Sequence, residues 1–250
     1  MSDYRNQLYS EYDTKFNKKI NVVTDDDLRS QENHYKVKLL PYLNYFSRDS
    51  KILELGCGPG YLLDFLSKSG FKNLKGIDIS SEQIILARSK GYDVDEVDVM
   101  KFLQHQTQTW DIIFAFDFIE HFSKIEVIEL FKMIHLKTAD DGMIFLRTPN
   151  AEGLFPNGII YGDLTHQTIF NKNSLSQLLN FSGFNYHLFF ENNPINKTMM
   201  GVIRNVLWKV VRVLLNFVKL IESGQAQKLW TRELYCVAWK EFQKQDLSKK

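Results

Sequence analysis

The chain of 250 residues has few cysteines and no excess of either charge, and both shortages exclude classes of protein. Its two cysteines, Cys57 and Cys236, cannot form a disulfide framework, a four-ligand zinc site of thiolates or an iron–sulfur cluster. With 31 basic and 30 acidic residues the net charge is only +1, so no global field recruits nucleic acid. We therefore expect no metal site and no nucleic-acid partner.

The start of the sequence is poor in apolar residues, because Met1-Ser-Asp-Tyr-Arg-Asn lacks the apolar stretch of a signal peptide. We expect a cytoplasmic protein, either free or peripheral to the inner face of the membrane. Hydrophobic residues make up 44% of the 250 residues, which suffices for one full core. No internal repeat or low-complexity stretch divides the chain, so we expect a single domain over residues 1–250.

Strand and helix patterns alternate along the middle of the chain, after one or two expected helices between Asp25 and Phe46. Strands separated by helices pair in parallel through right-handed crossovers. This predicts an α/β fold, with a doubly wound, mostly parallel sheet and helices on both faces. Strands are expected at residues 51–55, 74–78, 93–97, 110–116 and 142–148, and helices at 61–68, 81–89, 122–136 and 174–181.

Three alternating glycines, Gly56, Gly58 and Gly60, follow the first expected strand and precede a helix. Glycine backbone lets a ligand approach closely, and N–H groups at a helix start point outward. A dinucleotide fingerprint needs a glycine where Tyr61 stands, and a P-loop needs Gly-Lys-Ser/Thr, which the turn lacks. Asp78 ends the second expected strand, where a carboxylate accepts ribose hydroxyls. A nucleoside without a pyrophosphate is therefore the better ligand.

The spacing of Glu54 and these glycines resembles the E-x-G-x-G-x-G signature of the class I S-adenosylmethionine-dependent methyltransferases. The resemblance continues through Asp78, Val97-Asp98-Val99 and the segment from Asp111 to His121, and covers roughly residues 30–190. It implies a seven-stranded Rossmann-like sheet, S-adenosyl-L-methionine as cofactor and S-adenosyl-L-homocysteine as product. It also implies a helical cover over residues 1–48, a cofactor-binding core over 49–190, and an antiparallel hairpin of strands at 184–190 and 234–239.

By this resemblance, the glycine turn and the ends of the following strands hold the cofactor. Asp78 accepts bonds from the ribose hydroxyls, and Glu54 orients the glycine loop. Asp98 and Val99 flank the adenine, with the Asp98 side chain near its amino group. The full set of cofactor-binding candidates is Glu54, Gly56, Cys57, Gly58, Gly60, Asp78, Ile79, Asp98, Val99 and Asp117.

The fourth expected strand ends in Asp117-Phe-Ile-Glu120-His121, at the carboxyl edge where ligands bind in open α/β folds. Methyltransferases that act on nucleic-acid bases place a D/N-P-P-Y/F motif here, and the missing proline argues against base methylation. The small-molecule enzymes of the class commonly carry an acid–His pair at this position. This pair either faces the methionine moiety or caps the next helix, and His121 is a catalytic candidate.

A loop over residues 149–171 follows the fifth expected strand and is too long to be a simple connection. Its segment Tyr161-x-Asp163-x-Thr165-His166 resembles the loop of methyltransferases that modify sugars and other glycan precursors, and of quinone-pathway O-methyltransferases. We predict that Asp163 orients His166 as a general base, which a hydroxyl acceptor needs at neutral pH. A purely structural role for His166 stays open. The substrate-binding candidates are Asn150, Tyr161 and Thr165.

The segment 199–221 is apolar but interrupted by polar residues at steps of three and four, which predicts an amphipathic helix with a basic face. Within an insertion at 198–222, it packs on the protein's own core, on a second subunit, or in the interface of an anionic membrane. The charges exclude a membrane span. The polar residues are Arg204, Asn205, Lys209, Arg212, Asn216 and Lys219.

Together these patterns predict an O-methyltransferase that acts on a sugar, a nucleotide sugar or another capsule or glycan precursor in polysaccharide biosynthesis. A phosphoramidate group is a further acceptor within this prediction. Two alternatives stay open: a quinone-precursor O-methyltransferase at the membrane surface, and a non-catalytic module that only binds S-adenosylmethionine. The sequence does not name the acceptor.

Overall fold

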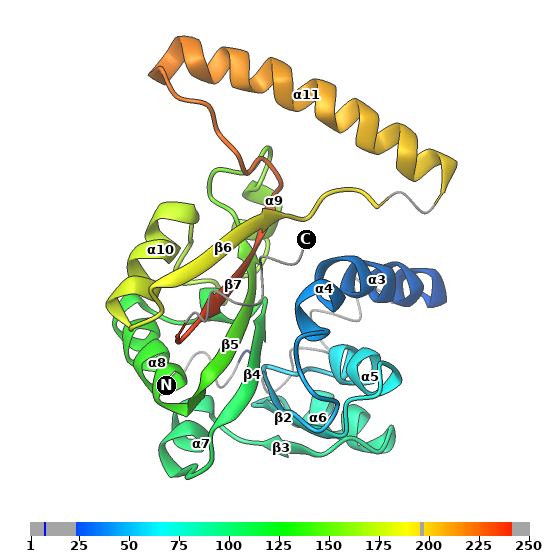
Figure 1. Cartoon of the computed structure of the whole chain (residues 1–250), viewed down its shortest axis with the longest axis vertical. Coiled ribbons are helices and arrows are strands. Elements are labelled where there is room, and N and C mark those ends of the chain that lie inside the picture. The colour runs from blue at the N-terminus through cyan, green and yellow to red at the C-terminus, as the bar shows by residue number, and fades with distance from the viewer. Residues whose placement is uncertain (1–7, 9–23, 196–197, 242–250) are drawn as a thin grey trace.

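The computed structural model describes residue 8 and residues 24–195 and 198–241. Its centre is a seven-stranded sheet in the order β3-β2-β1-β4-β5-β7-β6, with helices on both faces (Figure 1). This confirms the predicted doubly wound fold. The strands are β1 (Lys51–Leu55), β2 (Asn73–Asp78), β3 (Val94–Glu96), β4 (Trp110–Phe116), β5 (Thr138–Pro149), β6 (Tyr186–Glu191) and β7 (Glu233–Trp239).

Pairing along the sheet is parallel from β3 to β5, and β7 then runs antiparallel to both β5 and β6. The predicted late hairpin is therefore present. Because β1 and β4 are adjacent while their chain connections leave in opposite directions, the sheet has its topological switch point between them. The site described below is built from the turns beyond the carboxyl ends of these strands.

Helices cover the sheet because each buries one apolar side. Phe114 stacks on Phe145 at 5.1 Å between ring centroids, and the core beside them includes Tyr35 from α3 and Leu43 from α4. The helices are α3 (Asp25–Lys38), α4 (Leu40–Leu43), α5 (Tyr61–Lys68), α6 (Ser81–Ser89), α7 (Val99–His105), the short η2 (Ile119–His121), α8 (Lys124–Lys137), α9 (Asn157–Ile160), α10 (Lys172–Phe181) and α11 (Met199–Ser223).

Two local differences from the expected elements have physical causes. The third strand is shorter than expected, since α7 begins at Val99 with Asp98 as its N-cap, and the Asp98 side chain accepts a bond from Lys101 N at 3.1 Å. The N-terminal cover is formed by α3 and α4; the rest of the expected cover, apart from residue 8, lies outside the described residues. The capping box of Thr24 and Asp27 fixes where α3 starts.

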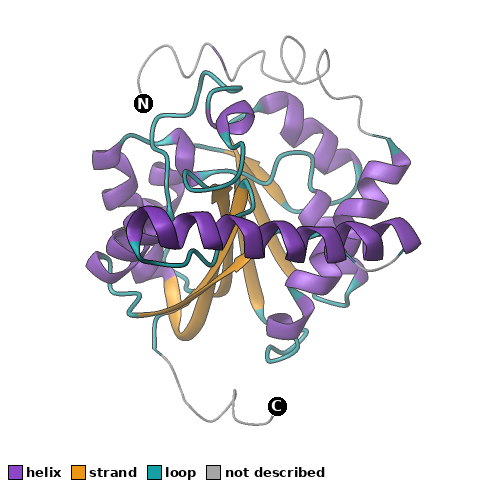
Figure 2. Ribbon diagram, turned by 90° about the horizontal axis from the view of Figure 1, so that it is seen from above, coloured by secondary structure: helices purple, strands orange, loops and turns teal. Residues whose placement is uncertain are grey.

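The long helix α11 lies across the carboxyl end of the sheet, joined to the body by two connections (Figures 1 and 2). It occupies the predicted insertion before the last strand. No residue of this helix is fully buried, so its apolar side does not pack on the protein's own core, and the second-subunit and membrane readings stay open. None of the helices in the described part of the chain combines the length and apolarity needed to cross a bilayer.

Candidate active site

The glycine turn after β1 folds so tightly that a side chain would not fit at two of its positions. Gly56 has φ +69°, and a Cβ there would lie 2.5 Å from Cδ2 of Phe118. Gly60 has φ +78°, and a Cβ would lie 2.9 Å from Cδ2 of Tyr92. Both backbone conformations favour glycine. Glycine at these two positions therefore lets the turn pack closely against Phe118 and Tyr92 before α5 begins.

Asp78 lies at the end of β2 and ties the glycine turn to the next helix. Its carboxylate accepts bonds from Gly58 N at 2.9 Å and from Ser80 N at 2.8 Å. Burial raises the pKa of Asp78, and the backbone N–H groups of Ser80 and Gly58 oppose that shift. Asp78, which is predicted to bind the ribose hydroxyls, thus also stabilises the glycine turn.

Glu54 lies in β1 beneath the turn, fully enclosed between its neighbouring strands. Its Oε2 lacks a hydrogen-bond partner among the described residues. The same is true of Ser80 Oγ and Gln83 Oε1, which follow Asp78 closely in the sequence. Burial raises the pKa of Glu54 well above its usual range, and the adjacent charge of Asp78 adds to the rise. A buried carboxyl group without a donor is costly, so this position suits a ligand that brings one.

The other candidates for cofactor binding lie at the same edge of the sheet, but their contacts indicate no specific role in binding the cofactor. Cys57 is buried, and burial raises the pKa of its thiol, so it is not a nucleophile. Ile79 follows Asp78 in the turn, and Val99 is buried in the core. The Asp98 side chain is used as a helix cap. Roles of these residues at the adenine stay predictions.

Arg147 binds the carboxylate of Asp117 with two donors, and the expected contact of Asp117 with the cofactor stays a prediction. Nε of Arg147 donates to Oδ1 at 3.0 Å, and Nη2 donates to Oδ2. The Asp117 backbone is left-handed, at φ +49°, a strained conformation for a residue with a side chain. Sequence reasoning missed Arg147; its position at the end of β5, in register with Phe116, was the available signal.

The two histidines of the site lie together, with ring centroids 4.8 Å apart. Thr165 Oγ1 donates to Asp163 Oδ1 at 2.6 Å and lies 2.8 Å from His121 Nδ1. His166 Nδ1 lies 3.1 Å from the carbonyl oxygen of Ile160, the geometry of an Nδ1–H donor to that oxygen. A backbone carbonyl thus holds Nδ1 of His166, and orientation of this ring by Asp163 stays a prediction. Asp163 is also linked, through Thr165, to His121.

Of the substrate-binding candidates, Asn150 is buried and hydrogen-bonded within the protein, whereas Tyr161 is exposed. The Asn150 amide nitrogen donates to the carbonyls of Leu229 and Thr231, and its oxygen accepts from Glu152 N. Asn150 is also buried, so its predicted contact with a substrate is wrong and it instead tethers the loop to the segment before β7. Tyr161 is 80% exposed at the end of α9, where a contact with an acceptor stays a prediction.

Glu120, His121 and His166 bring potential ligand atoms within 4.8 Å of one another. Oε1 of Glu120 is buried and has no hydrogen-bond partner among the described residues, while Oε2 accepts from Thr148 Oγ1 at 3.1 Å. Burial raises the pKa of Glu120 well above its usual range, with the charge of Asp117 next in importance. One carboxylate and two imidazoles form a set that can coordinate a divalent cation. The site chemistry below does not require one.

The environment of His121 predicts a pH-dependent stability. Burial, with His166 next to it, lowers the pKa of His121 to about 4. An unfolded histidine titrates near 6.5, so the unfolded chain binds more protons below that pH, and stability falls as the pH drops from about 6.5 toward 4. Between pH 7 and 5 this group should remove about 2 kcal/mol. Urea unfolding at both pH values should show His121→Gln losing about 2 kcal/mol less than wild type.

The exposed His105 provides the matched control for this measurement, since His105→Gln should keep the wild-type pH dependence. Equal pH dependence in His121→Gln and wild type would show that the fold does not hold His121 neutral.

A cavity of about 840 Å³ opens at the same edge of the sheet, between α3, α11, the loop after β5 and the start of β7. It combines cationic and aromatic side chains, and His121, Asp163 and His166 are not among its described lining residues. No local sequence pattern predicts this cavity, because its walls come from segments far apart in the chain. Its polar and aromatic lining includes Arg29, Asn33, Arg204, Trp208, Trp230 and Arg232.

Comparison with known proteins agrees with this geometry. The family model described as a methyltransferase domain matches residues 28–188. A ubiquinone biosynthesis O-methyltransferase of Actinobacillus pleuropneumoniae serotype 7 (strain AP76) is 32% identical over 111 residues, covering 40% of this chain and 46% of that enzyme. The chain thus spans about half the length of this curated relative.

Two solved structures share the fold. A methyltransferase dependent on S-adenosylmethionine from Archaeoglobus fulgidus is 20% identical, with a TM-score of 0.62 over 85% of this chain and 96% of that one. The magnesium protoporphyrin IX methyltransferase of Synechocystis PCC 6803, with bound S-adenosylhomocysteine, is 11% identical, with a TM-score of 0.60 over 95% of this chain and 99% of that one. At these identities the likeness shows the fold alone.

Proposed function

Because the chain belongs to the methyltransferase domain family and uses S-adenosylmethionine as its methyl donor, we propose that it methylates a hydroxyl group on a polar, anionic acceptor of the glycan-precursor type. The observation that carries this proposal is the pair of oriented imidazoles, His121 and His166, at the carboxyl edge of the sheet. Methyl transfer to a hydroxyl needs a base, whereas transfer to a carboxylate or phosphoryl oxygen does not.

The residues around the glycine turn fit the cofactor. Gly56 and Gly60 keep the turn before α5 tight, and Glu54 holds a buried carboxyl oxygen that lacks a donor among the described residues. Asp78 would hold the ribose hydroxyls, and Glu54 would meet the cationic amino group of the methionine part. When bound, S-adenosylmethionine supplies an electrophilic methyl group on a sulfonium sulfur.

His166 is the better candidate for the base. Its Nδ1–H is held by the carbonyl of Ile160, which fixes the ring and leaves Nε2 as the proton-accepting nitrogen. His121 is deeper, and burial lowers its pKa to about 4, so it is a weak base that stays neutral at physiological pH. The protein's main contribution is the alignment of donor and acceptor, which is worth up to about 7–11 kcal/mol in favourable cases.

The cavity at the same edge of the sheet, whose described lining does not include the two histidines, favours a polar acceptor with an anionic group. Arg29 and Arg232 place guanidinium groups around it, beside the carboxylates of Asp26 and Glu233, and guanidinium groups bind phosphate and carboxylate oxygens. Trp208 and Trp230 add the flat apolar surface on which a sugar ring can stack. A sugar phosphate, a nucleotide sugar or a phosphoramidate-bearing glycan precursor combines both features.

The experiment is to measure S-adenosylhomocysteine release with a panel of sugar nucleotides, sugar phosphates, phosphoramidates and catechol-type quinone precursors. We expect turnover with an anionic sugar acceptor, and a KM raised about tenfold with kcat kept in Arg232→Gln, since removing one charged hydrogen bond costs roughly 1.5 kcal/mol of binding. Cofactor binding without turnover on any acceptor would contradict the proposal and favour a binding module.

A quinone precursor is the second candidate acceptor. The relative named a ubiquinone biosynthesis O-methyltransferase favours it, as does the exposed apolar face of α11. Turnover of catechol-type acceptors, with no activity on any sugar derivative, would replace the first candidate by this one. Both candidates need the same base, so the acceptor panel separates them while the histidine variants do not.

A further inference from the structure

The helix α11 is the most apolar exposed surface in the described part of the chain. Of the 25 large hydrophobic residues exposed there, 13 lie on this one helix. They recur at helical spacing along one side from Met199 to Ile221; Val213, Phe217 and Ile221 are 69%, 64% and 73% exposed. Isolated exposed apolar residues are ordinary, but a continuous face of this size marks an interaction surface.

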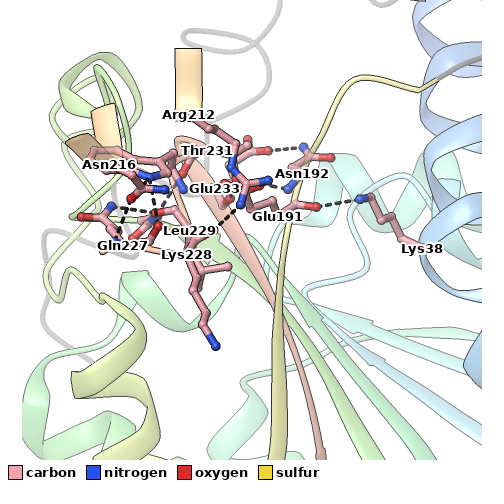
Figure 3. Close-up of polar contacts among 12 residues, drawn as sticks. Lys38, Glu191, Asn192, Arg212, Asn216, Gln227, Lys228, Leu229, Thr231 and Glu233 are labelled. Carbon is pink, nitrogen blue, oxygen red and sulfur yellow. Dashed lines mark hydrogen bonds and ion pairs between the residues drawn. The ribbon is translucent and has the colours of Figure 1, made fainter. Parts of the chain in front are cut away.

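The polar side of α11 is fixed to the body, so the apolar side cannot turn inward (Figure 3). Arg212 Nη1 lies 3.0 Å from the buried carboxylate of Glu191 at the end of β6. Asn216 Oδ1 accepts bonds from Gln227 N at 2.9 Å and from Trp230 Nε1 at 3.2 Å. Arg212 also donates to the Lys228 carbonyl at 3.2 Å. These bonds set the rotation of the helix about its own axis.

Three hydrogen bonds extend this attachment into the body (Figure 3). Glu191 accepts from Trp230 N through its side chain, and its carbonyl accepts from Lys38 Nζ at 2.6 Å. Asn192 donates to the Glu233 carboxylate at 2.7 Å. α11 is thus joined to α3, β6 and β7 through its polar side. The result is a helix that holds the catalytic body on one side and presents an apolar face on the other.

From this arrangement we propose that the outer face of α11 docks on an anionic lipid surface, with the helix axis in the plane of the membrane. A helix of 25 residues is about 37 Å long and can bury its apolar side along the boundary between headgroups and acyl chains. Exposed Arg204 and Lys209 flank the apolar face on its two sides, where they would meet lipid phosphates. Among the described residues no carboxylate pairs with either of them.

Charge disfavours a second copy of the chain as the occupant. The only acidic residue of α11 is Glu222, and Lys219 binds it at 2.8 Å. A symmetric helix pair would therefore place Arg204 and Lys209 beside the basic flanks of its partner, without the complementary acids that specify such pairs. An anionic lipid surface supplies the missing charge. The docking inference does not depend on which acceptor the enzyme methylates.

The test is sedimentation of the full chain with vesicles of phosphatidylcholine containing about 30% phosphatidylglycerol. The wild type should sediment with these vesicles, bind pure phosphatidylcholine at least about tenfold more weakly, and dissociate as salt rises. Leu214→Gln/Phe217→Gln, which keeps a good helix former at both sites, should lower the partition coefficient at least about tenfold. Lys209→Glu should weaken binding about fivefold or more, since it removes one cation and adds an anion.

Matched controls are available on other exposed faces. Ile125→Gln/Leu136→Gln removes two equally exposed apolar residues from α8, and Lys101→Glu reverses a charge on α7. Both should bind vesicles as the wild type does. Wild-type protein that stays in the supernatant at low salt would overturn the proposal. A dimer seen by light scattering that dissociates in Leu214→Gln/Phe217→Gln, without vesicle binding, would assign the face to a second copy.

Discussion

Replacing His166 by alanine should lower the methyl-transfer rate about 10²–10⁴-fold, the usual contribution of a positioned base, while leaving the affinity for S-adenosylhomocysteine unchanged. The ring's Nδ1 is bound to the carbonyl of Ile160, in the loop after β5, so its loss should not alter the backbone of the glycine turn. Single-turnover kinetics with the acceptor found in the panel, together with calorimetry for the cofactor, separate the two effects.

His187 provides a matched control for this variant. Its ring lies near a carbonyl in the same way, with Nδ1 3.3 Å from Phe184 O, but it lies on β6 and its Nε2 is 3.1 Å from Ser176 Oγ. His187→Ala should therefore keep the rate. Asp163→Asn should lower the rate less than His166→Ala, because Asp163 reaches the site through Thr165 and His121. A wild-type rate in His166→Ala would contradict the assignment.

Chelation should leave the rate unchanged if the imidazole acts as a base. A rate that falls with chelator and returns with a divalent cation would instead assign Glu120, His121 and His166 to a metal, since these three groups lie within reach of one ion.

The cofactor half of the site could be predicted because its determinants are local. A glycine turn after a buried strand dictates backbone geometry over a few residues, and Gly56 and Gly60 have the left-handed conformations that this turn requires. The parallel sheet could be predicted because strand and helix patterns alternate along the chain, and local hydrophobic periodicity reveals both patterns. Asp78 then lies beside the turn, because β1 and β2 pair in parallel with their ends in register.

The acceptor half could not be predicted in the same way, because it depends on contacts between distant segments. Asp163 and His166 are close in sequence, which suggested a direct contact, yet the fold brings His121 to Thr165 across 44 positions of sequence separation. The Asn150 amide donates hydrogen bonds to carbonyls in the segment before β7, and no local sequence pattern indicates these bonds. Likewise, the hydrophobic period of α11 predicts an apolar and a polar face. Contacts with distant segments, made by Arg212 and Asn216, decide which face turns inward.

Replacing Asp78 by alanine should weaken S-adenosylhomocysteine binding by roughly 1.5–3 kcal/mol, about 10- to 150-fold in Kd, because charged hydrogen bonds to the ribose are lost. The carboxylate also accepts from Gly58 N and Ser80 N, so part of the loss will come from a looser glycine turn. Isothermal titration calorimetry measures the affinity, and circular dichroism checks the fold. Asp78→Asn keeps an acceptor oxygen for one backbone N–H and should lose less.

Asp111 is the matched control for the structural part of this effect. Its carboxylate also binds a backbone N–H, that of Lys51 at 2.8 Å, but at the amino edge of the sheet, away from the glycine turn. Asp111→Ala should therefore lower stability without changing the affinity for S-adenosylhomocysteine. If a folded Asp78→Ala bound the product as tightly as wild type, the carboxylate would belong to the turn alone. The ribose would then be held by other groups at this edge, with Gln83 the next to test, since its Oε1 is buried and lacks a partner among the described residues.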